Sequence, residues 1–99
     1  MYCGTLKSGE NYIIANTENL QRSKLEIFFS EKGNMDFNRK LTIFDASNNN
    51  DPTLEGVMAC HYPAAIESDG KLYVITTKNF DSWIRRGAEL FVIDLKDII

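Results

Sequence analysis

The stretch that decides the fold is Gly4–Ile14, GTLKSGENYII, because a similar stretch recurs at Ala64–Ile75, AAIESDGKLYVI. Each copy has a short run before a polar turn that ends in glycine, and then an aromatic and β-branched run. This order is typical of a β-hairpin, and the Asp-Gly pair of the second copy is a strong turn signal. The sequence therefore predicts two related hairpins about 60 residues apart.

The repeat continues beyond the hairpins. Arg22 precedes Leu25-Glu26-Ile27 in the first copy, and Arg86 precedes Leu90-Phe91-Val92 in the second. Each copy thus reads as strand, tight turn, strand, polar connection and strand. A repeated antiparallel unit of about four strands is typical of a β-propeller blade, which cannot bury both of its faces alone. We therefore predict an all-β chain of two antiparallel four-stranded propeller blades.

The remaining apolar runs set the boundaries of these units. Short strands are expected within residues 1–6, 12–15, 25–29, 41–44, 64–66, 72–77 and 89–94. The first blade is predicted over 1–45, an inter-blade connection over 46–60, and the second blade over 61–99 with its outer strand missing. Two blades do not close a ring, so we expect a C-terminal fragment of a longer propeller or one copy of an assembly.

Two segments also fit a helix. The apolar residues of 18–29 lie near helical spacing, although Ile27-Phe28-Phe29 favours a strand, which is our prediction. Ser82–Arg85 also fits a single helical turn.

Composition excludes several classes of function. Of the 99 residues, 43 % are hydrophobic, which is enough for a packed core. The 14 acidic residues outnumber the 11 basic ones, so the chain lacks the excess positive charge expected of a protein that binds nucleic acid or an anionic membrane. Its apolar runs are far shorter than the roughly 20 residues that span a bilayer, and the first residues do not resemble a signal peptide. The compartment is left open.

The cysteines do not predict a metal site. Cys3 and Cys60 have no zinc-type spacing, and His61 is the single histidine. We expect both cysteines to be buried or semi-buried thiols rather than a disulfide, and we expect no metal or cofactor.

Two groups of residues give the chain a family resemblance. Cys3-Gly4-Thr5-Leu6-x-x-Gly9-x-x-Tyr12, with Arg22-Ser23-Lys24-Leu25 leading into Ser30-x-x-Gly33-x-x-x-Phe37, resembles the later blades of the sialidase (neuraminidase) superfamily. His61-Tyr62-Pro63 followed by Asp69–Val74 resembles the next blade. These enzymes are six-bladed propellers with bacterial-neuraminidase repeats, and Ser30–Phe37 is similar to a degenerate Asp-box, which in the family is structural and lies away from the active site. The chain would cover about a third of such a propeller.

The resemblance implies roles for Tyr62 and Arg22. In sialidases a tyrosine at the start of this strand attacks the anomeric carbon, an exception to the usual carboxylate nucleophile. An arginine before the strand that leads into an Asp-box binds the substrate carboxylate, for which the planar guanidinium is well suited. Tyr62 is followed here by Pro63, as in related propellers of other specificity. A tyrosine that packs or stacks on a sugar is therefore the alternative.

Three further residues are candidates for substrate binding. Arg86 corresponds to Arg22 in the repeat, and Trp83 precedes it in the same polar segment, so the two could contact a sugar by hydrogen bonds and stacking. His61 has the pKa range of a general acid or base. Each also has a purely structural explanation, as a solvated arginine or a hydrogen-bonded histidine.

The function implied is that of a C-terminal fragment of a sialidase-like glycoside hydrolase, of the exo-α-sialidase type, acting on terminal acidic sugars of glycans. The partners expected are a carbohydrate substrate and the remaining blades, from the same parent chain or from further copies, and neither nucleic acid nor a membrane. The isolated chain is expected to be inactive, since other catalytic groups would lie on other blades. One alternative is a non-catalytic glycan-binding propeller made of three copies. Another is a stand-alone antiparallel interaction module.

Overall fold

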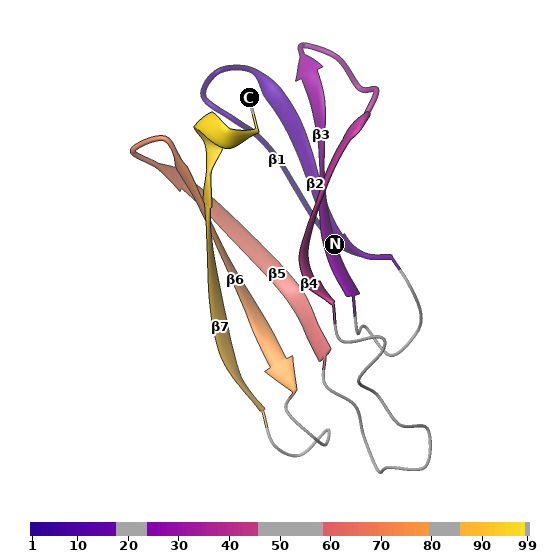
Figure 1. The fold of residues 1–99 in the computed structure, drawn as a ribbon, viewed down its shortest axis with the longest axis vertical. Coiled ribbons are helices and arrows are strands. Elements are labelled where there is room, and N and C mark those ends of the chain that lie inside the picture. Colours follow the sequence, from indigo (N-terminus) through magenta and orange to yellow (C-terminus); the bar gives the residue numbers. More distant parts are fainter. Residues whose placement is uncertain (18–23, 46–58, 80–85, 99) are drawn as a thin grey trace.

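The chain folds into two antiparallel sheets. The computed structural model describes residues 1–17, 24–45, 59–79 and 86–98. Its elements are β1 (Tyr2–Thr5), β2 (Glu10–Asn16), β3 (Lys24–Lys32), β4 (Arg39–Asp45), β5 (Ala59–Ser68), β6 (Lys71–Asn79), β7 (Arg86–Asp94) and the short 3-10 helix η1 (Leu95–Asp97). The strand orders are β1-β2-β3-β4 and β5-β6-β7, so within each sheet the strands pair in the order of the sequence (Figure 1). The prediction of an all-β chain with two antiparallel sheets is confirmed.

Each predicted strand is present where the structure describes it, and the largest change of boundary is in β5. Residues 25–29 lie within β3, so the helical alternative is wrong for 24–29, while 18–23 and 82–85 lie outside the described residues. Strand β5 begins at Ala59, earlier than the expected run at 64–66, and therefore contains Tyr62 and Pro63. The second sheet has three strands within the described residues.

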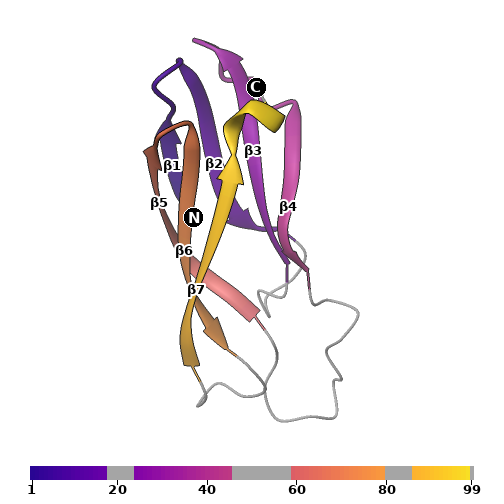
Figure 2. The same cartoon turned by 60° about the vertical axis from the view of Figure 1, so that its left-hand side comes forward.

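The two sheets pack face to face around one core (Figure 2). Alternate residues of each strand point into it, as the pleat of a strand requires. The buried apolar residues are Leu6, Tyr12, Ile14, Leu25, Ile27, Phe29, Cys60, Leu72, Val74, Ile93 and Leu95. Hydrogen bonds also join the layers: the Tyr2 hydroxyl donates to the Ala65 carbonyl at 3.1 Å, and Arg39 Nη1 donates to the Ile98 carbonyl at 2.8 Å.

The two copies of the repeat have the same orientation, so their matched residues point in the same direction: into the core in the first copy and away from it in the second. In the first copy, the inward-facing residues are at most 5 % exposed: Leu6, Tyr12, Ile14, Leu25 and Ile27. Their counterparts in the repeat are Ile66, Tyr73, Ile75, Leu90 and Val92. These residues pair with one another across β5, β6 and β7 and lie on the face of the second sheet that points away from the first. Four of them are 51–68 % exposed.

The second sheet closes the core with its other face, which carries Leu72, Val74 and Ile93. The two units are therefore stacked head to tail: one face of the first sheet packs against the opposite face of the second. A two-fold arrangement would instead have brought the matched residues of the two copies against each other.

Glycine at position 4 is required by the close approach of Tyr12. A Cβ atom on Gly4 would lie 2.4 Å from Tyr12 Oη and 2.5 Å from Cζ. The Tyr12 ring cannot easily move aside, because its centroid lies 6.3 Å from that of Tyr2 and 6.4 Å from that of Phe29. The pair Gly4–Tyr12 thus fixes how closely β1 lies beside the core.

We predict that Gly4→Ala lowers the free energy of unfolding by about 1–3 kcal/mol, the usual cost of overpacking a core. Urea denaturation followed by circular dichroism measures the change. The control is Cys3→Ala on the same strand, where the side chain is exposed and no change above a few tenths of a kcal/mol is expected. Equal midpoints for Gly4→Ala and the wild type would contradict the packing described here.

Candidate functional site

The strand ends that carry the predicted site residues meet at one end of the molecule. Lys24 pairs with Asp45, and Asn79 pairs with both Ala59 and Arg86. Segments 18–23, 46–58 and 80–85 therefore attach to the described strands at the same end, below in Figure 1, which we call the loop end.

A side-chain amide joins the two sheets at the loop end. Asn16 Nδ2 donates to the Cys60 carbonyl at 2.8 Å and to the Lys24 carbonyl at 3.1 Å. These two bonds fix the beginning of β5 against the end of β2 and the beginning of β3. The segment around Tyr62 is thereby held beside the first sheet.

The structure describes the predicted residues unequally. Arg22 and Trp83 lie outside the described residues. The backbones of His61 and Arg86 are described: His61 lies in β5 opposite Thr77, and Arg86 begins β7. Tyr62 is the one predicted site residue whose side chain the structure describes.

Tyr62 lies on a β-bulge that turns it toward solvent. Between His61 and Ala64 the pairing with β6 shifts by one residue, so Tyr62 and Pro63 together oppose a single residue of β6. Tyr62 has a positive φ of 51° and is 68 % exposed, whereas Pro63 is buried. β5 is an edge strand, where a proline without an N–H group is tolerated.

The backbone at Tyr62 is unusual for an aromatic residue. A positive φ costs an L-residue with a bulky side chain free energy, so the surrounding structure must hold it there. Bulges and strained residues of this kind recur beside functional sites, where they direct a side chain. Pro63, with its fixed φ and buried ring, restricts the backbone next to Tyr62.

The Asp-box-like segment Ser30–Phe37 lies at the other end, where β3 turns into β4. The Asn11 backbone N–H donates to Ser30 Oγ at 3.1 Å, and Asn11 Nδ2 donates to the Asn34 carbonyl at 3.0 Å. Gly33 adopts a φ of 70° in this turn. These bonds tie the turn to β2, so the segment has a structural role and is remote from Tyr62.

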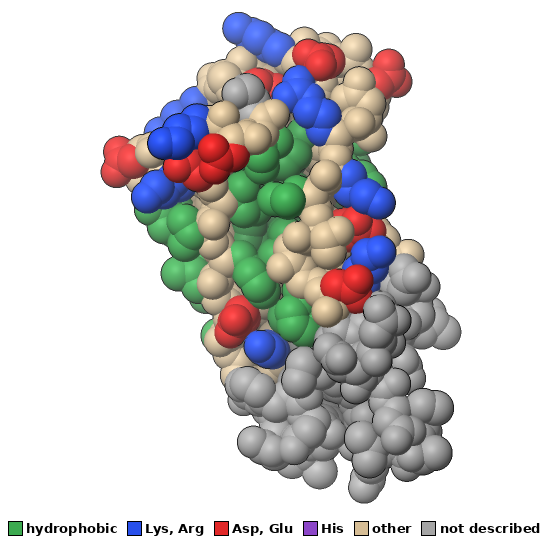
Figure 3. All heavy atoms as spheres, viewed as in Figure 1, with side chains coloured by type: hydrophobic (Ala, Val, Ile, Leu, Met, Phe, Trp, Pro, Cys, Tyr) green, Lys and Arg blue, Asp and Glu red, His purple; other side chains and the backbone are tan. Residues whose placement is uncertain are grey.

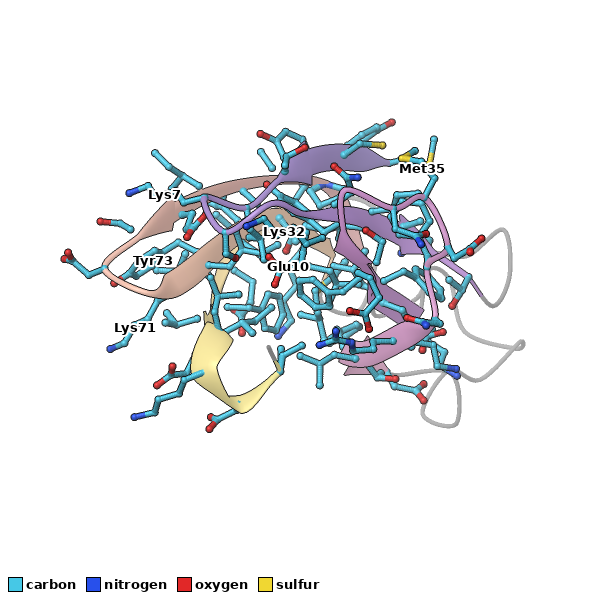
Figure 4. All side chains as sticks on the ribbon, turned by 90° about the horizontal axis from the view of Figure 1, so that it is seen from above. Lys7, Glu10, Lys32, Met35, Lys71 and Tyr73 are labelled. Atoms are coloured by element: carbon cyan, nitrogen blue, oxygen red, sulfur yellow. The ribbon has the colours of Figure 1, made fainter. Side chains whose placement is uncertain are left out.

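A surface hollow at this second end is lined by residues that include Ser8, Glu67, Lys71, Asp94 and Lys96. Glu67 Oε1 accepts the Lys7 backbone N–H at 2.7 Å, and Lys96 Nζ lies 3.7 Å from Asp94 Oδ2. Figure 4 shows this end from above, with Lys7 and Lys71 pointing outward. The hollow contains none of the predicted site residues.

Glu26 is a buried carboxylate that sequence reasoning missed. Its side chain is 4 % exposed, and it accepts hydrogen bonds from Thr17 Oγ1 at 2.6 Å and Thr42 Oγ1 at 3.0 Å. Lys40 Nζ lies 3.4 Å from Oε2 and Lys24 Nζ lies 3.9 Å from Oε1. The hydrogen bond from Thr17 is the main reason that the pKa of Glu26 is lowered, and it outweighs the opposing effect of burial. Glu26 is thus ionised and paired near neutral pH.

The two cysteines differ in their surroundings. Both are free thiols, and Cys60 is fully buried, which raises the pKa of its thiol. Cys3 is exposed on the outer side of β1, so the expectation that both are at least semi-buried is wrong for Cys3. Neighbouring Gly4 faces Tyr12, and the alternation along β1 therefore directs Cys3 outward. Within the described residues, no group of three or more His, Cys, Asp or Glu side chains could hold a metal ion.

Comparisons with family models, curated proteins and solved structures found no match to this chain. Among the described residues, no helix is long and apolar enough to cross a bilayer.

We predict that Glu26→Gln lowers the free energy of unfolding at pH 7 by about 1–3 kcal/mol, because hydrogen bonds to a charged acceptor are lost. A carboxyl group whose pKa is lowered by folding stabilises the protein above its unfolded pKa. That stabilisation is lost as the pH falls through the folded pKa. The variant should therefore lose less stability than the wild type between about pH 5 and pH 2.

The matched control is Glu31→Gln, which removes an exposed carboxylate that pairs with Arg39 at 2.9 Å. Such a surface pair contributes little, so we expect a change below about 1 kcal/mol. Urea titrations at several pH values measure both variants. Parallel pH profiles for wild type and Glu26→Gln would show that Glu26 is not the paired carboxylate described here.

Proposed function

We propose that this chain supplies two neighbouring blades of a sialidase-like glycoside hydrolase propeller, and that Tyr62 belongs to a glycan site at the loop end. One observation carries the proposal: Tyr62 is exposed on a positive-φ bulge at the end where the segments with Arg22 and Trp83 attach. The backbone positions of His61 and Arg86 at the same end agree with it.

The head-to-tail stacking of the two copies supports the propeller part of the proposal. Blades around a ring all face the same way, so each covers one face of the next. The connections between β2 and β3, between β4 and β5 and between β6 and β7 share one end, and the Asp-box-like turn lies at the other. The family resemblance leads us to expect this division between a substrate end and a structural end.

The proposed site divides the chemistry among groups of different kinds. Arg22 would pair with the sugar carboxylate through its planar guanidinium, which stays charged at any working pH. The phenol of Tyr62 would either attack the anomeric carbon or stack on the sugar ring. Attack requires a base to accept the phenolic proton, because the usual pKa of tyrosine is about 10. We assign that base, the general acid and further arginines to other blades, so this chain alone should bind weakly and not hydrolyse.

A non-catalytic glycan-binding module is the second candidate. It is favoured by the exposed apolar face of the second sheet, which fits a chain that assembles with others of its kind. The two candidates share the sugar site at Tyr62 and differ in whether hydrolysis occurs once the ring is complete.

We predict that the ¹⁵N-labelled chain binds the α-methyl glycoside of sialic acid with millimolar affinity, seen as NMR shift changes at residues 60–64 and 87–89. Tyr62→Ala should weaken binding at least about tenfold, since an aromatic stacking contact is lost. Tyr62→Phe should keep most of the affinity, because the ring remains. Neither variant, nor the wild type, should hydrolyse an aryl sialoside.

Lys96→Ala is the matched control, since this exposed side chain lies at the opposite end, and it should bind as the wild type does. Methyl β-galactoside, a neutral sugar, tests the carboxylate requirement and should give much smaller shift changes. Shift changes confined to the opposite end, or equal affinity for Tyr62→Ala and wild type, would refute the proposed site.

A further inference from the structure

The second sheet has a contiguous apolar face that nothing in the described chain covers. We call it the open face; its residues are Ala64, Ile66, Tyr73, Ile75, Leu90 and Val92. Ile66 is 68 % exposed, Ile75 51 %, Leu90 57 % and Val92 52 %. Figure 3 shows hydrophobic side chains along the left-hand side of the molecule, over this sheet, as well as in the seam between the sheets.

This surface is not an ordinary scatter of exposed apolar residues. Single exposed leucines are common, but a joined apolar patch usually marks an interface. In β6, apolar residues occupy both faces, with Leu72 and Val74 in the core and Tyr73 and Ile75 on the open face. A strand with this continuous apolar pattern is typical of a sheet that is covered on both sides.

The repeat indicates what kind of surface covers the open face. In the first copy, the matched residues are buried beneath the second sheet, by the face that carries Leu72, Val74 and Ile93. The open face therefore fits a sheet surface corresponding to that one. In the first copy, the residues that correspond to Leu72, Val74 and Ile93 are Asn11, Ile13 and Phe28, on the outer side of the β1–β4 sheet.

The outer side of the β1–β4 sheet has the apolar residues needed to cover the open face of another copy. Ile13 and Phe28 pair across β2 and β3 and are half-buried, and Met35 beside them is 72 % exposed. An apolar groove on this side is lined by residues that include Cys3, Ile13, Met35 and Phe37. Among the described residues, Glu26 is the buried carboxylate on this side, and it already has its hydrogen bonds and ion pairs, so covering the sheet would not leave this charge unpaired.

We infer that a second copy of this chain packs the outer side of its β1–β4 sheet on the open face. One chain carries both halves of the contact, on opposite sides of the molecule, as the positions of Tyr73 and Met35 in Figure 4 show. Such a contact is heterologous and repeats the head-to-tail stacking already present within the chain. Three copies would complete a ring of six sheets if the rotation per sheet closes.

The proposed contact and the sugar site involve different residues. The contact uses the open face and the outer side of the β1–β4 sheet and not Tyr62, so sialoside binding and self-association are independent measurements. If the chain binds the sialoside through Tyr62 but stays monomeric, the proposed function stands and this inference fails. In that case the open face would belong against a sheet of another chain or of a longer parent.

Sedimentation velocity between about 5 and 500 μM tests the contact. The wild type should associate reversibly beyond the monomer. Leu90→Asp places a charge on the open face, and Ile13→Lys places one on the outer side of the β1–β4 sheet. Each should raise the dissociation constant of self-association at least tenfold. Met35→Glu changes a more exposed residue on the outer side of the β1–β4 sheet and replaces Ile13→Lys if that variant unfolds. Circular dichroism should show that the Leu90→Asp variant remains folded, because Leu90 lies outside the core.

Mixing the two kinds of variant gives the decisive result. The Leu90→Asp variant keeps an intact outer side of the β1–β4 sheet, and the Met35→Glu or Ile13→Lys variant keeps an intact open face. A heterologous contact therefore predicts a one-to-one complex of the mixed variants that grows no further. Lys96→Glu, at the end opposite the loop end, should associate as the wild type does. A wild type that is monomeric throughout, or an association that survives Leu90→Asp, would overturn the inference.

Discussion

The burial of one face of each sheet against the other is the interaction on which the rest of the structure depends. Each of the two described sheets has an apolar face that would be unfavourable in water, so each sheet needs a cover. The first sheet contributes the face with Tyr12, Ile14 and Leu25, and the second contributes the face with Leu72 and Val74. The same contact orients the two repeats head to tail and leaves the apolar residues of the open face toward solvent.

The candidate site follows from this contact. Asn16 joins the sheets where β5 begins, and Tyr62 is exposed on the bulge that follows. The pleat alone would continue β5 as a regular strand; the extra residue at Tyr62-Pro63 changes which way the side chain points. The strained φ of Tyr62 is thus maintained by pairing on both sides of it, at His61 and Ala64.

Much of the fold could be read from the sequence, because alternation and turn residues report local geometry. The hairpins at Gly9 and Gly70 and the strand at Leu25–Phe29 are examples. The exposure of Cys3 and the burial of Glu26 could not be read in this way. Both depend on which side of a strand faces the second sheet and on partners such as Thr17 and Thr42 that are distant in the sequence. The bulge at Tyr62 was missed for a similar reason: an aromatic residue before proline does not specify a positive φ.

The orientation of the repeats is the central claim, and methyl nuclear Overhauser effects test it most directly. With labelled isoleucine, leucine and valine methyl groups, the structure predicts contacts between the two sheets within the core cluster, which contains Ile14 and Leu25 of the first sheet and Leu72 and Val74 of the second. It predicts no such contacts to Ile75 or Leu90 of the same molecule, and a dilute sample or the Met35→Glu variant limits the measurement to contacts within one molecule. Strong effects between Ile14 and Ile75 would mean that the matched residues of the two copies face each other. Head-to-tail stacking would then be wrong.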